Sequence, residues 1–423
     1  MSFQQGLSGL NAASKSLETI GNNVANANTV GFKSSQAQFA DVYASALSGA
    51  GAGQIGIGTK LSNVAQQFTQ GNITGTNNPL DMAINGGGFF RMSNNGAITY
   101  GRNGQFQLDK NGYIVNPEGS RLTGYMADLT GTISKGAPTD INIRTTDLPP
   151  VATTDLLQQV NLNSNNTVPV TTPFDPTDPT SYNSTNSVTV YDSIGNGHVM
   201  QSYYVKTATA GEWQVYAQVD GVDVTFGAAP GTPFSTVTFG TDGAINAATA
   251  ALMPFAVNID LDAVATANGK VNSATATQVV NLDFTGSTQF GSPFGVNKLT
   301  QDGYTSGRLS GFNLSADGMI TGRYTNGESA TLGQIVLANF ANPNGLQPLG
   351  NNVWAESSAS GQALVGTPDS GSLGVLQSSA TEDSNVDLTA ELVNMITAQR
   401  VYQANAQTIK TQDQVMQTLV NLR

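Results

Sequence analysis

Residues 2–27 read SFQQGLSGLNAASKSLETIGNNVANA, and apolar or small side chains recur in them at alternating spacings of three and four. This spacing puts those side chains on one stripe of an α-helix. The stripe consists of Phe3, Gly6, Leu10, Ala13, Leu17, Ile20, Val24 and Ala27. Each glycine inside a helix costs about 1 kcal/mol relative to alanine. Because Gly6, Gly9 and Gly21 all lie in this helix, we expect it to fray unless a partner packs against it.

The C-terminal stretch repeats the pattern. Its stripe consists of Leu388, Leu392, Met395, Gln399, Tyr402, Ala406, Ile409, Asp413, Met416 and Val420. The simplest way to bury two such stripes is to pack each helix against the other as a coiled coil. We therefore predict a polymerisation interface of Phe3, Leu10, Leu17, Ile20, Val24, Leu388, Leu392, Met395, Tyr402, Ile409, Met416 and Val420. The alternative is an ordinary helix pair docked on a globular core.

The chain between these stretches has the pattern of β-structure. Asn-Gly and Asp-Gly pairs, which favour the backbone of tight hairpins, begin at Asn95, Asn103, Asn111, Asp220, Asp242, Asp302, Asp317 and Asn326. Strand-like runs lie between them, for example at residues 187–191, 203–205 and 334–338. The sequence thus predicts a multidomain α+β protein with helical ends and two mainly-β domains between them.

Glycine and proline clusters mark the expected domain boundaries. Gly49–Gly53 reads as a flexible connector, and the prolines at positions 149 and 150 read as a domain exit. We predict a helical polymerisation domain (1–32 and 380–423), a connector (33–72), an inner β domain (73–145 and 286–379) and an outer, variable β domain (146–285). In this scheme the β domains are nested and discontinuous, because the chain runs outward and returns.

Composition excludes several classes of function. The net charge is -12 with only 17 Lys plus Arg, and charged residues are 11% of the chain. Nucleic-acid binding needs a basic surface, so we expect none, and no stretch has the ~20 apolar residues of a membrane span. Cysteine is absent, which excludes disulfides and thiolate sites. The N-terminus has neither the basic nor the apolar region of an ordinary secretory signal peptide.

We predict no catalytic, cofactor or metal site, and no enzymatic activity. The single histidine, His198, lies beside a turn, and we expect it to be exposed rather than part of a catalytic triad. Gly86–Gly88 lacks the Gly-Lys-Ser/Thr ending of a phosphate loop, so we expect a bend between strands. Asp109–Gly112 resembles a fragment of a calcium loop without its remaining ligands, and a hairpin turn is the better interpretation. Carboxylates such as Glu382 are scattered along the sequence, and nothing indicates the convergent pair that a glycosidase needs.

Residues 20–33 read IGNNVANANTVGFK, and this segment closely resembles the signature of the bacterial flagellar rod and hook protein family. The residues that carry the signature are Asn22, Asn23, Asn26, Gly31 and Phe32. Further resemblances to the family follow at residues 78–90, 100–106, 337–346, 352–354 and 386–405. The match is weakest between about 146 and 285, the expected outer domain.

The resemblance implies a subunit of an axial flagellar tube. Rod subunits of the family are generally shorter, so the length favours a hook subunit, which builds a curved, hollow, flexible tube that transmits torque as a universal joint. The implied partners are further copies of the chain, the distal rod, the hook cap, the hook–filament junction proteins and the flagellar export apparatus. Export by that apparatus to the outside of the cell would account for the missing signal peptide. The alternatives are a distal rod subunit and, from a different class, a secreted β-rich adhesin or carbohydrate-binding protein.

Overall fold

The computed structural model describes residues 2–42, 56–128, 131–143, 146–224 and 232–421. The expected connector at Gly49–Gly53 lies outside these residues. The chain divides into two compact units. The first contains residues 1–145, 310–323 and 329–423, and the second contains residues 146–309 and 324–328.

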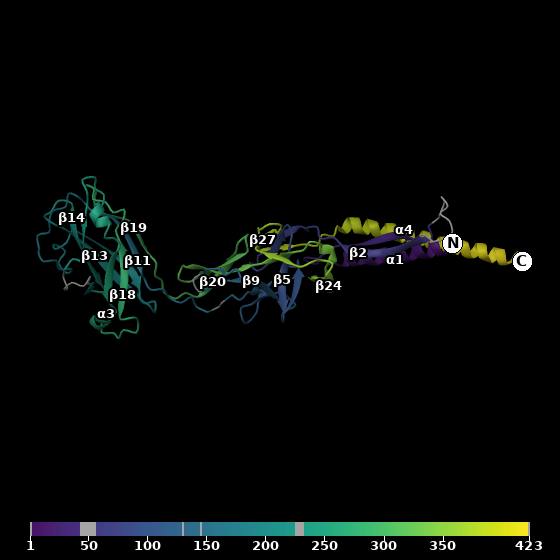
Figure 1. Ribbon diagram of the computed structural model, residues 1–423, viewed down its shortest axis with the longest axis horizontal. Coiled ribbons are helices and arrows are strands. Elements are labelled where there is room, and N and C mark those ends of the chain that lie inside the picture. The colour runs from purple at the N-terminus through teal and green to yellow at the C-terminus, as the bar shows by residue number, and fades with distance from the viewer. Residues whose placement is uncertain (1, 43–55, 129–130, 144–145, 225–231, 422–423) are drawn as a thin grey trace. The chain divides into compact units, whose positions relative to one another are not determined.

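The two chain ends of the first unit are helices that lie side by side (Figure 1). Helix α1 covers Ser2–Ala25 and helix α4 covers Leu388–Asn421. A hairpin of β1 (Ser35–Val42) and β2 (Gly58–Gln66) packs along α1. The expected connector at 33–72 is therefore in large part an antiparallel hairpin, whose strands pair from Ser35 with Gln66 to Val42 with Gly58.

The body of the first unit is β-structure to which early and late parts of the chain both contribute. Its strands are β3 (Ile73–Gly75), β4 (Met82–Asn85), β5 (Phe89–Asn94), β6 (Ala97–Gly101), β7 (Gln107–Leu108), β8 (Ile114–Val115), β9 (Arg121–Met126), β10 (Thr139–Asp140), β20 (Leu309–Leu314), β21 (Met319–Tyr324), β22 (Ser329–Ile335), β23 (Leu337–Asn339), β24 (Gln347–Gly350), β25 (Val353–Ala355), β26 (Leu364–Gly366), β27 (Val375–Ser378) and β28 (Ala380–Glu382), with a 3-10 helix at Pro343–Gly345. The main sheet has the order β20-β21-β22-β9-β5-β6-β25-β24. Strands β27 and β28, which precede α4, pair with β4 and β3.

Edge-to-face aromatic contacts fill one core of this unit. The ring of Phe68 lies 5.4 Å from that of Phe89 and 5.5 Å from that of Trp354, measured between centroids. Phe340 closes the cluster against Phe89 and Tyr100. Since Phe68 follows the β1–β2 hairpin directly, this core also anchors the end of the hairpin that packs along α1.

The second unit consists of two sheets packed over one core. Its elements are β11 (Asp155–Asn161), β12 (Ser184–Tyr191), β13 (Gly197–Lys206), β14 (Glu212–Val219), β15 (Val222–Asp223), β16 (Ser235–Thr238), α2 (Ala247–Ala250), β17 (Phe255–Asp260), α3 (Leu261–Ala267), β18 (Thr277–Asp283) and β19 (Gly295–Gln301). The sheet orders are β17-β18-β11-β19 and β12-β13-β14-β15, with β16 on β14. Buried Leu156, Trp213 and Val257 belong to the shared core. The unit extends beyond the expected end at 285 because β19 pairs with β11.

Local predictions agree with the structure at most turns. Asn95 and Asp220 have a positive φ of 49°, and each precedes a glycine in the tight hairpins β5–β6 and β14–β15. The bend at Gly86–Gly88 lies between β4 and β5, as predicted. The expected strand at 334–338 is divided instead, because β22 pairs with β9 while β23 pairs with β5. The mostly-β fold with a helix at each end is confirmed.

Candidate assembly interface

Glycines set how closely the two helices approach. A Cβ atom added at Gly6 would lie 3.0 Å from Cγ1 of Ile409, and one added at Gly9 would lie 2.6 Å from Oδ1 of Asn405. These contacts also show that the helices are antiparallel. Two of the three glycines that weaken α1 as an isolated helix, Gly6 and Gly9, therefore allow α4 to pack closely against it, whereas Gly21 faces open space.

The stripe of α4 that lies against α1 differs from the predicted one. The least exposed residues of α4 are Glu391, Met395, Ala398, Asn405, Ala406, Ile409 and Gln412. Several of them are polar, so an apolar pattern could not single them out. Met395 and Ile409 are shared with the predicted interface.

The remaining predicted interface residues are divided between the helix contact and the surface. In α1, Ile20 is buried and Leu10, Leu17 and Val24 are half-buried, whereas Phe3 is 52% exposed. In α4, the side chains of Leu388, Leu392, Tyr402, Met416 and Val420 are exposed. A single copy of the chain thus leaves much of the predicted stripe open to solvent.

A groove runs beside the helix contact. It has a volume of about 690 Å³ and is bordered by α1, α4 and β1. Small side chains line it on the α1 side, among them Gly9, Ala12, Ala13 and Ser16. Such a surface offers shape and apolar area for a packing partner, with few charged groups.

Asn23, at the centre of the family signature, joins three elements. Its buried side chain donates hydrogen bonds to the carbonyl oxygen of Ser35 (2.8 Å) and to Oε1 of Glu391 (2.9 Å), and it accepts one from the Ser35 amide (2.9 Å). The signature residue therefore fixes the end of α1 to both β1 and α4. A side chain without both a donor and an acceptor could not replace it.

The other signature residues shape the exit from α1. The Asn26 side chain donates to the carbonyl oxygen of Asn22 (2.9 Å) and so stabilises the last turn. Gly31 has a φ of 71°, and a Cβ atom there would lie 2.5 Å from the amide nitrogen of Asn103. Phe32 is buried. Asn26, Gly31 and Phe32 thus each have a structural role here, whereas Asn22 takes part through its carbonyl oxygen.

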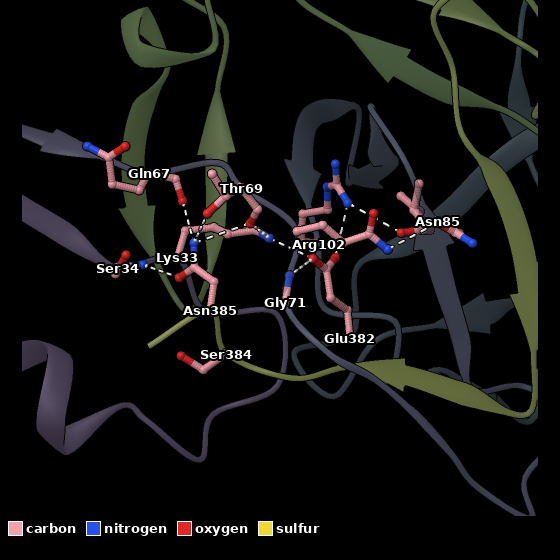
Figure 2. Close-up of polar contacts among 12 residues, drawn as sticks. Lys33, Ser34, Gln67, Thr69, Gly71, Asn85, Arg102, Glu382, Ser384 and Asn385 are labelled. Carbon is pink, nitrogen blue, oxygen red and sulfur yellow. Dashed lines mark hydrogen bonds and ion pairs between the residues drawn. The ribbon is translucent and has the colours of Figure 1, made fainter. Parts of the chain in front are cut away.

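A buried cluster of charges lies where the helices meet the β body (Figure 2). Nζ of Lys33 lies 2.7 Å from Oε1 of Glu382, and Nη1 of Arg102 lies 3.0 Å from Oε2 of the same carboxylate. The Gly71 amide donates a third hydrogen bond to Glu382 (2.9 Å). Nζ of Lys33 also donates to the Thr69 carbonyl oxygen (2.8 Å). One carboxylate therefore links three segments that are distant in sequence.

Burial dominates the electrostatics of this cluster. The side chains of Lys33 and Glu382 are fully buried, and that of Arg102 is 4% exposed. Burial lowers the pKa of Lys33, and attraction to Glu382 opposes the shift. The pKa of Arg102 is lowered for the same reason, again against the attraction of Glu382. Since an isolated buried charge is costly, the cluster is stable only while all its members are in place.

Asn385 completes the junction just before α4. Its Oδ1 accepts a hydrogen bond from the Ser34 amide (2.7 Å), and its Nδ2 donates to the carbonyl oxygen of Gln67 (2.7 Å) (Figure 2). Sequence reasoning missed Lys33, Arg102, Glu382 and Asn385 as a set. The available signal was that Lys33 and Arg102 belong to motifs that resemble the family, in a chain where charges are rare.

His198 in the second unit is not the exposed residue that we predicted. Its Nδ1 lies 2.8 Å from Oδ2 of Asp220, its Nε2 lies 3.6 Å from Oδ2 of Asp192, and its side chain is 17% exposed. The turn between β12 and β13 and the hairpin β14–β15 bring both carboxylates to it. Within the described residues, no group of three or more His, Cys, Asp or Glu side chains is arranged to hold a metal ion.

Among the residues that the structure describes, no helix combines the length and the apolarity needed to cross a bilayer.

Four protein-family models match successive parts of the chain. The matches are "Flagella basal body rod protein" (residues 3–33), "Flagellar hook protein FlgE/F/G D1 domain" (residues 83–168), "Flagellar basal body protein FlaE D2 domain" (residues 161–304) and "Flagellar basal body rod FlgEFG protein C-terminal" (residues 377–422). Three of these matches include the three members of the charge cluster, one each.

Whole-length relatives are also found. The chain is 47% identical over 429 residues to the flagellar hook protein FlgE of Salmonella typhimurium strain LT2, and 46% identical over 431 residues to that of Escherichia coli K12. Both matches cover 100% of this chain and 100% of the relative. The crystal structure of Helicobacter pylori flagellar hook protein FlgE2 matches with a TM-score of 0.49 at 14% identity, over 72% of this chain and 99% of that chain.

Proposed function

The chain belongs to the flagellar hook protein family, and we propose that it assembles into the hook through its terminal helices. It is a structural subunit of the bacterial flagellar hook, as its whole-length relatives are named. Those relatives support neither the distal rod subunit nor the adhesin. The finer proposal is a helical homopolymer in the form of a hollow, curved, flexible tube that transmits torque, without catalytic activity.

The observation that carries the proposal is the apolar surface left open on the helices. Leu388, Leu392, Val393 and Ile396 are exposed in the first turns of α4, and Phe3 and Leu7 are exposed at the start of α1. Burying such a side chain contributes about 1.5–3 kcal/mol. If several of them are buried between copies, in a coiled-coil arrangement within and between subunits, the free energy gained would offset the entropy cost of ordering these helices.

From Gln403 onward, one face of α4 is polar, although Val415, Met416 and Val420 are exposed elsewhere on that part of the helix. Gln403, Gln407, Gln414 and Gln417 are exposed there, together with a single cation, Lys410. We propose that this polar, weakly charged surface lines the central channel of the tube. Unfolded subunits in transit would meet hydrogen-bonding groups but little charge or apolar area.

The second unit carries most of the net negative charge of the chain, -10 of -12. It contains 14 of the 29 acidic residues but only 4 of the 17 basic ones. Copies of such a unit repel one another when they are packed side by side. We propose that it forms the outer wall, where small polar contacts let neighbouring subunits slide as the tube bends.

The remaining partners follow from the family. We propose that subunits leave the cell through the flagellar export apparatus. They then assemble outside the cell on the distal rod, beneath the hook cap, and later contact the hook–filament junction proteins.

Electron microscopy of the purified chain under salting-out conditions tests the proposal. The unsubstituted chain should form hollow, curved tubes. Leu392→Asp should abolish them while leaving a folded monomer, because it places a charge in the exposed apolar surface. Gln407→Asp adds the same charge to an exposed polar residue of the same helix and should form normal tubes. Normal tubes from Leu392→Asp would contradict the interface, and straight tubes from the unsubstituted chain would favour a rod subunit.

A further inference from the structure

Helix α4 extends past the start of α1. The contacts of Gly9 with Asn405 and of Gly6 with Ile409 set the antiparallel register. Continuing it places Ser2, the first residue of α1, near Asp413. Since α4 ends at Asn421 and a helix rises 1.5 Å per residue, about 12 Å of α4 projects beyond α1 (Figure 1). We call residues 413–421 the overhang.

The overhang carries the same stripe as the packed part of α4. The residues that face α1 end with Ile409 and Gln412, and the same spacing leads on to Met416 and Val420. Where α1 covers the stripe, Ala398 is 8% exposed, whereas Met416 is 61% and Val420 is 72% exposed. The overhang therefore presents the surface that α4 uses to bind α1, beyond the point where α1 begins.

The groove beside the helix pair has the complementary character. Its α1 side is lined by Gly9, Ala12, Ala13 and Ser16, the same kind of small-residue surface that receives α4 within the chain. Its volume of about 690 Å³ falls in the range of clefts that hold a ligand, roughly 300–1,000 Å³. Charge opposes the fit only weakly, because Asp413 is the single ionisable side chain of the overhang and Glu391 is the single one that lines the groove.

We propose that the overhang of one subunit docks in this groove of a second copy of the chain, an inference that rests on the proposed function. The overhang cannot reach its own groove. Ala12 lies opposite about residue 402 of α4, and Val420 is 18 residues further along, about 27 Å away at 1.5 Å per residue. The contact joins two different surfaces, so it is heterologous. Its repetition produces a ring or, where the rotation between copies does not close, an open helical polymer.

Engineered cysteines test the docking directly, because the natural chain has no cysteine. One preparation carries Val420→Cys and another, with a different affinity tag, carries Ala12→Cys. They are mixed, polymerised by salting out and oxidised. We expect disulfide-linked dimers that carry both tags, at least about five-fold more abundant than with the control pair Gln414→Cys and Ala12→Cys. Gln414 lies on the opposite face of the overhang, out of the short range that a disulfide requires.

Each outcome decides between the two proposals. Polymers whose cross-linking does not exceed the control overturn the docking and leave the proposed function intact. A chain that forms no polymer contradicts the proposed function and, with it, the docking. As a second measurement, Met416→Asp should raise the critical concentration for polymerisation at least about ten-fold, equivalent to 1.4 kcal/mol. Gln414→Asp should leave it unchanged, and equal values for the two variants would overturn the docking.

Discussion

Replacing Glu382 with glutamine should destabilise the first unit by about 3–5 kcal/mol, because it leaves two buried cations without their shared anion. The substitution keeps the shape of the side chain and an oxygen that can accept from the Gly71 amide. What is lost is the charge that Lys33 and Arg102 contact at 2.7 and 3.0 Å. The expected magnitude therefore comes from uncompensated burial and not from a cavity.

Tryptophan fluorescence can report this change in the intact protein. The chain has two tryptophans, Trp354 in the core of the first unit and Trp213 in the core of the second. In a Trp213→Phe background, urea unfolding followed at Trp354 reports the first unit alone. With a urea m-value of about 3 kcal/mol/M, the midpoint should fall by roughly 1 to 1.7 M.

Two further variants make the reasoning refutable. Asp140→Asn removes a carboxylate from the partly exposed pair with Arg121 in the same unit and should cost no more than about 1 kcal/mol. Lys33→Met leaves Glu382 paired with Arg102 and should fall between the two. If Glu382→Gln costs no more than Asp140→Asn, the cluster does not hold the junction together. If Lys33→Met costs more than Glu382→Gln, uncompensated charge is not the cause.

Three further predictions concern the signature and the second unit. Asn23→Ala removes three hydrogen bonds and should lower the free energy of unfolding by about 2–4 kcal/mol in the same Trp354 assay. Asn22→Ala, at an exposed position, should lower it by under about 0.5 kcal/mol. Equal losses would contradict the role of Asn23. In Gly31→Ala the new Cβ atom would lie 2.5 Å from backbone and the residue would keep a positive φ, whereas in Gly96→Ala the φ is also positive (92°) but the Cβ atom points into open space. Gly31→Ala should therefore lower the free energy of unfolding by clearly more than the ~1 kcal/mol expected for Gly96→Ala. A smaller loss at position 31 would refute the close contact. Burial raises the pKa of Asp302, but hydrogen bonds from Thr154 and Asp155 outweigh it and hold the pKa below its ordinary value. The stability that Asp302 contributes is therefore present above its unfolded pKa of about 3.9 and lost as pH falls through the folded value. In a Trp354→Phe background, the urea midpoint followed at Trp213 should fall more from pH 7 to pH 3 than it does in the same protein with Asp302→Asn. Parallel curves for the two proteins would contradict this.

The sequence was sufficient for the elements whose formation depends on local pattern. The apolar spacing predicted both terminal helices, and Asn-Gly or Asp-Gly pairs marked hairpins such as β5–β6 and β14–β15. Both signals are local, since a 3.6-residue period and a left-handed turn need only neighbouring residues. The resemblance of residues 20–33 to the rod and hook family likewise led to the correct family.

Features that depend on contacts between residues far apart in the chain could not be predicted from such local patterns. Lys33 and Glu382 are 349 positions apart, and no periodicity links them. The stripe of α4 that faces α1 includes Glu391, Asn405 and Gln412, which a search for apolar residues passes over. Glu391 is there because Asn23 bonds to it, and Asn405 because Gly9 leaves room for it. Tertiary contacts, not residue polarity, thus decide which face of α4 is inward.

The two ends of the helix pair differ in how firmly they are held, and this difference bears on how a hook subunit works. At the end next to the β body, Asn23, Asn385 and the cluster around Glu382 fix α1 and α4 by buried hydrogen bonds and ion pairs. At the other end, the contact rests on Gly6 and Gly9, and Met416 and Val420 remain exposed. We infer that, in the proposed polymer, the free end contacts neighbouring subunits, whereas the fixed end joins the helices to the β body of the same subunit.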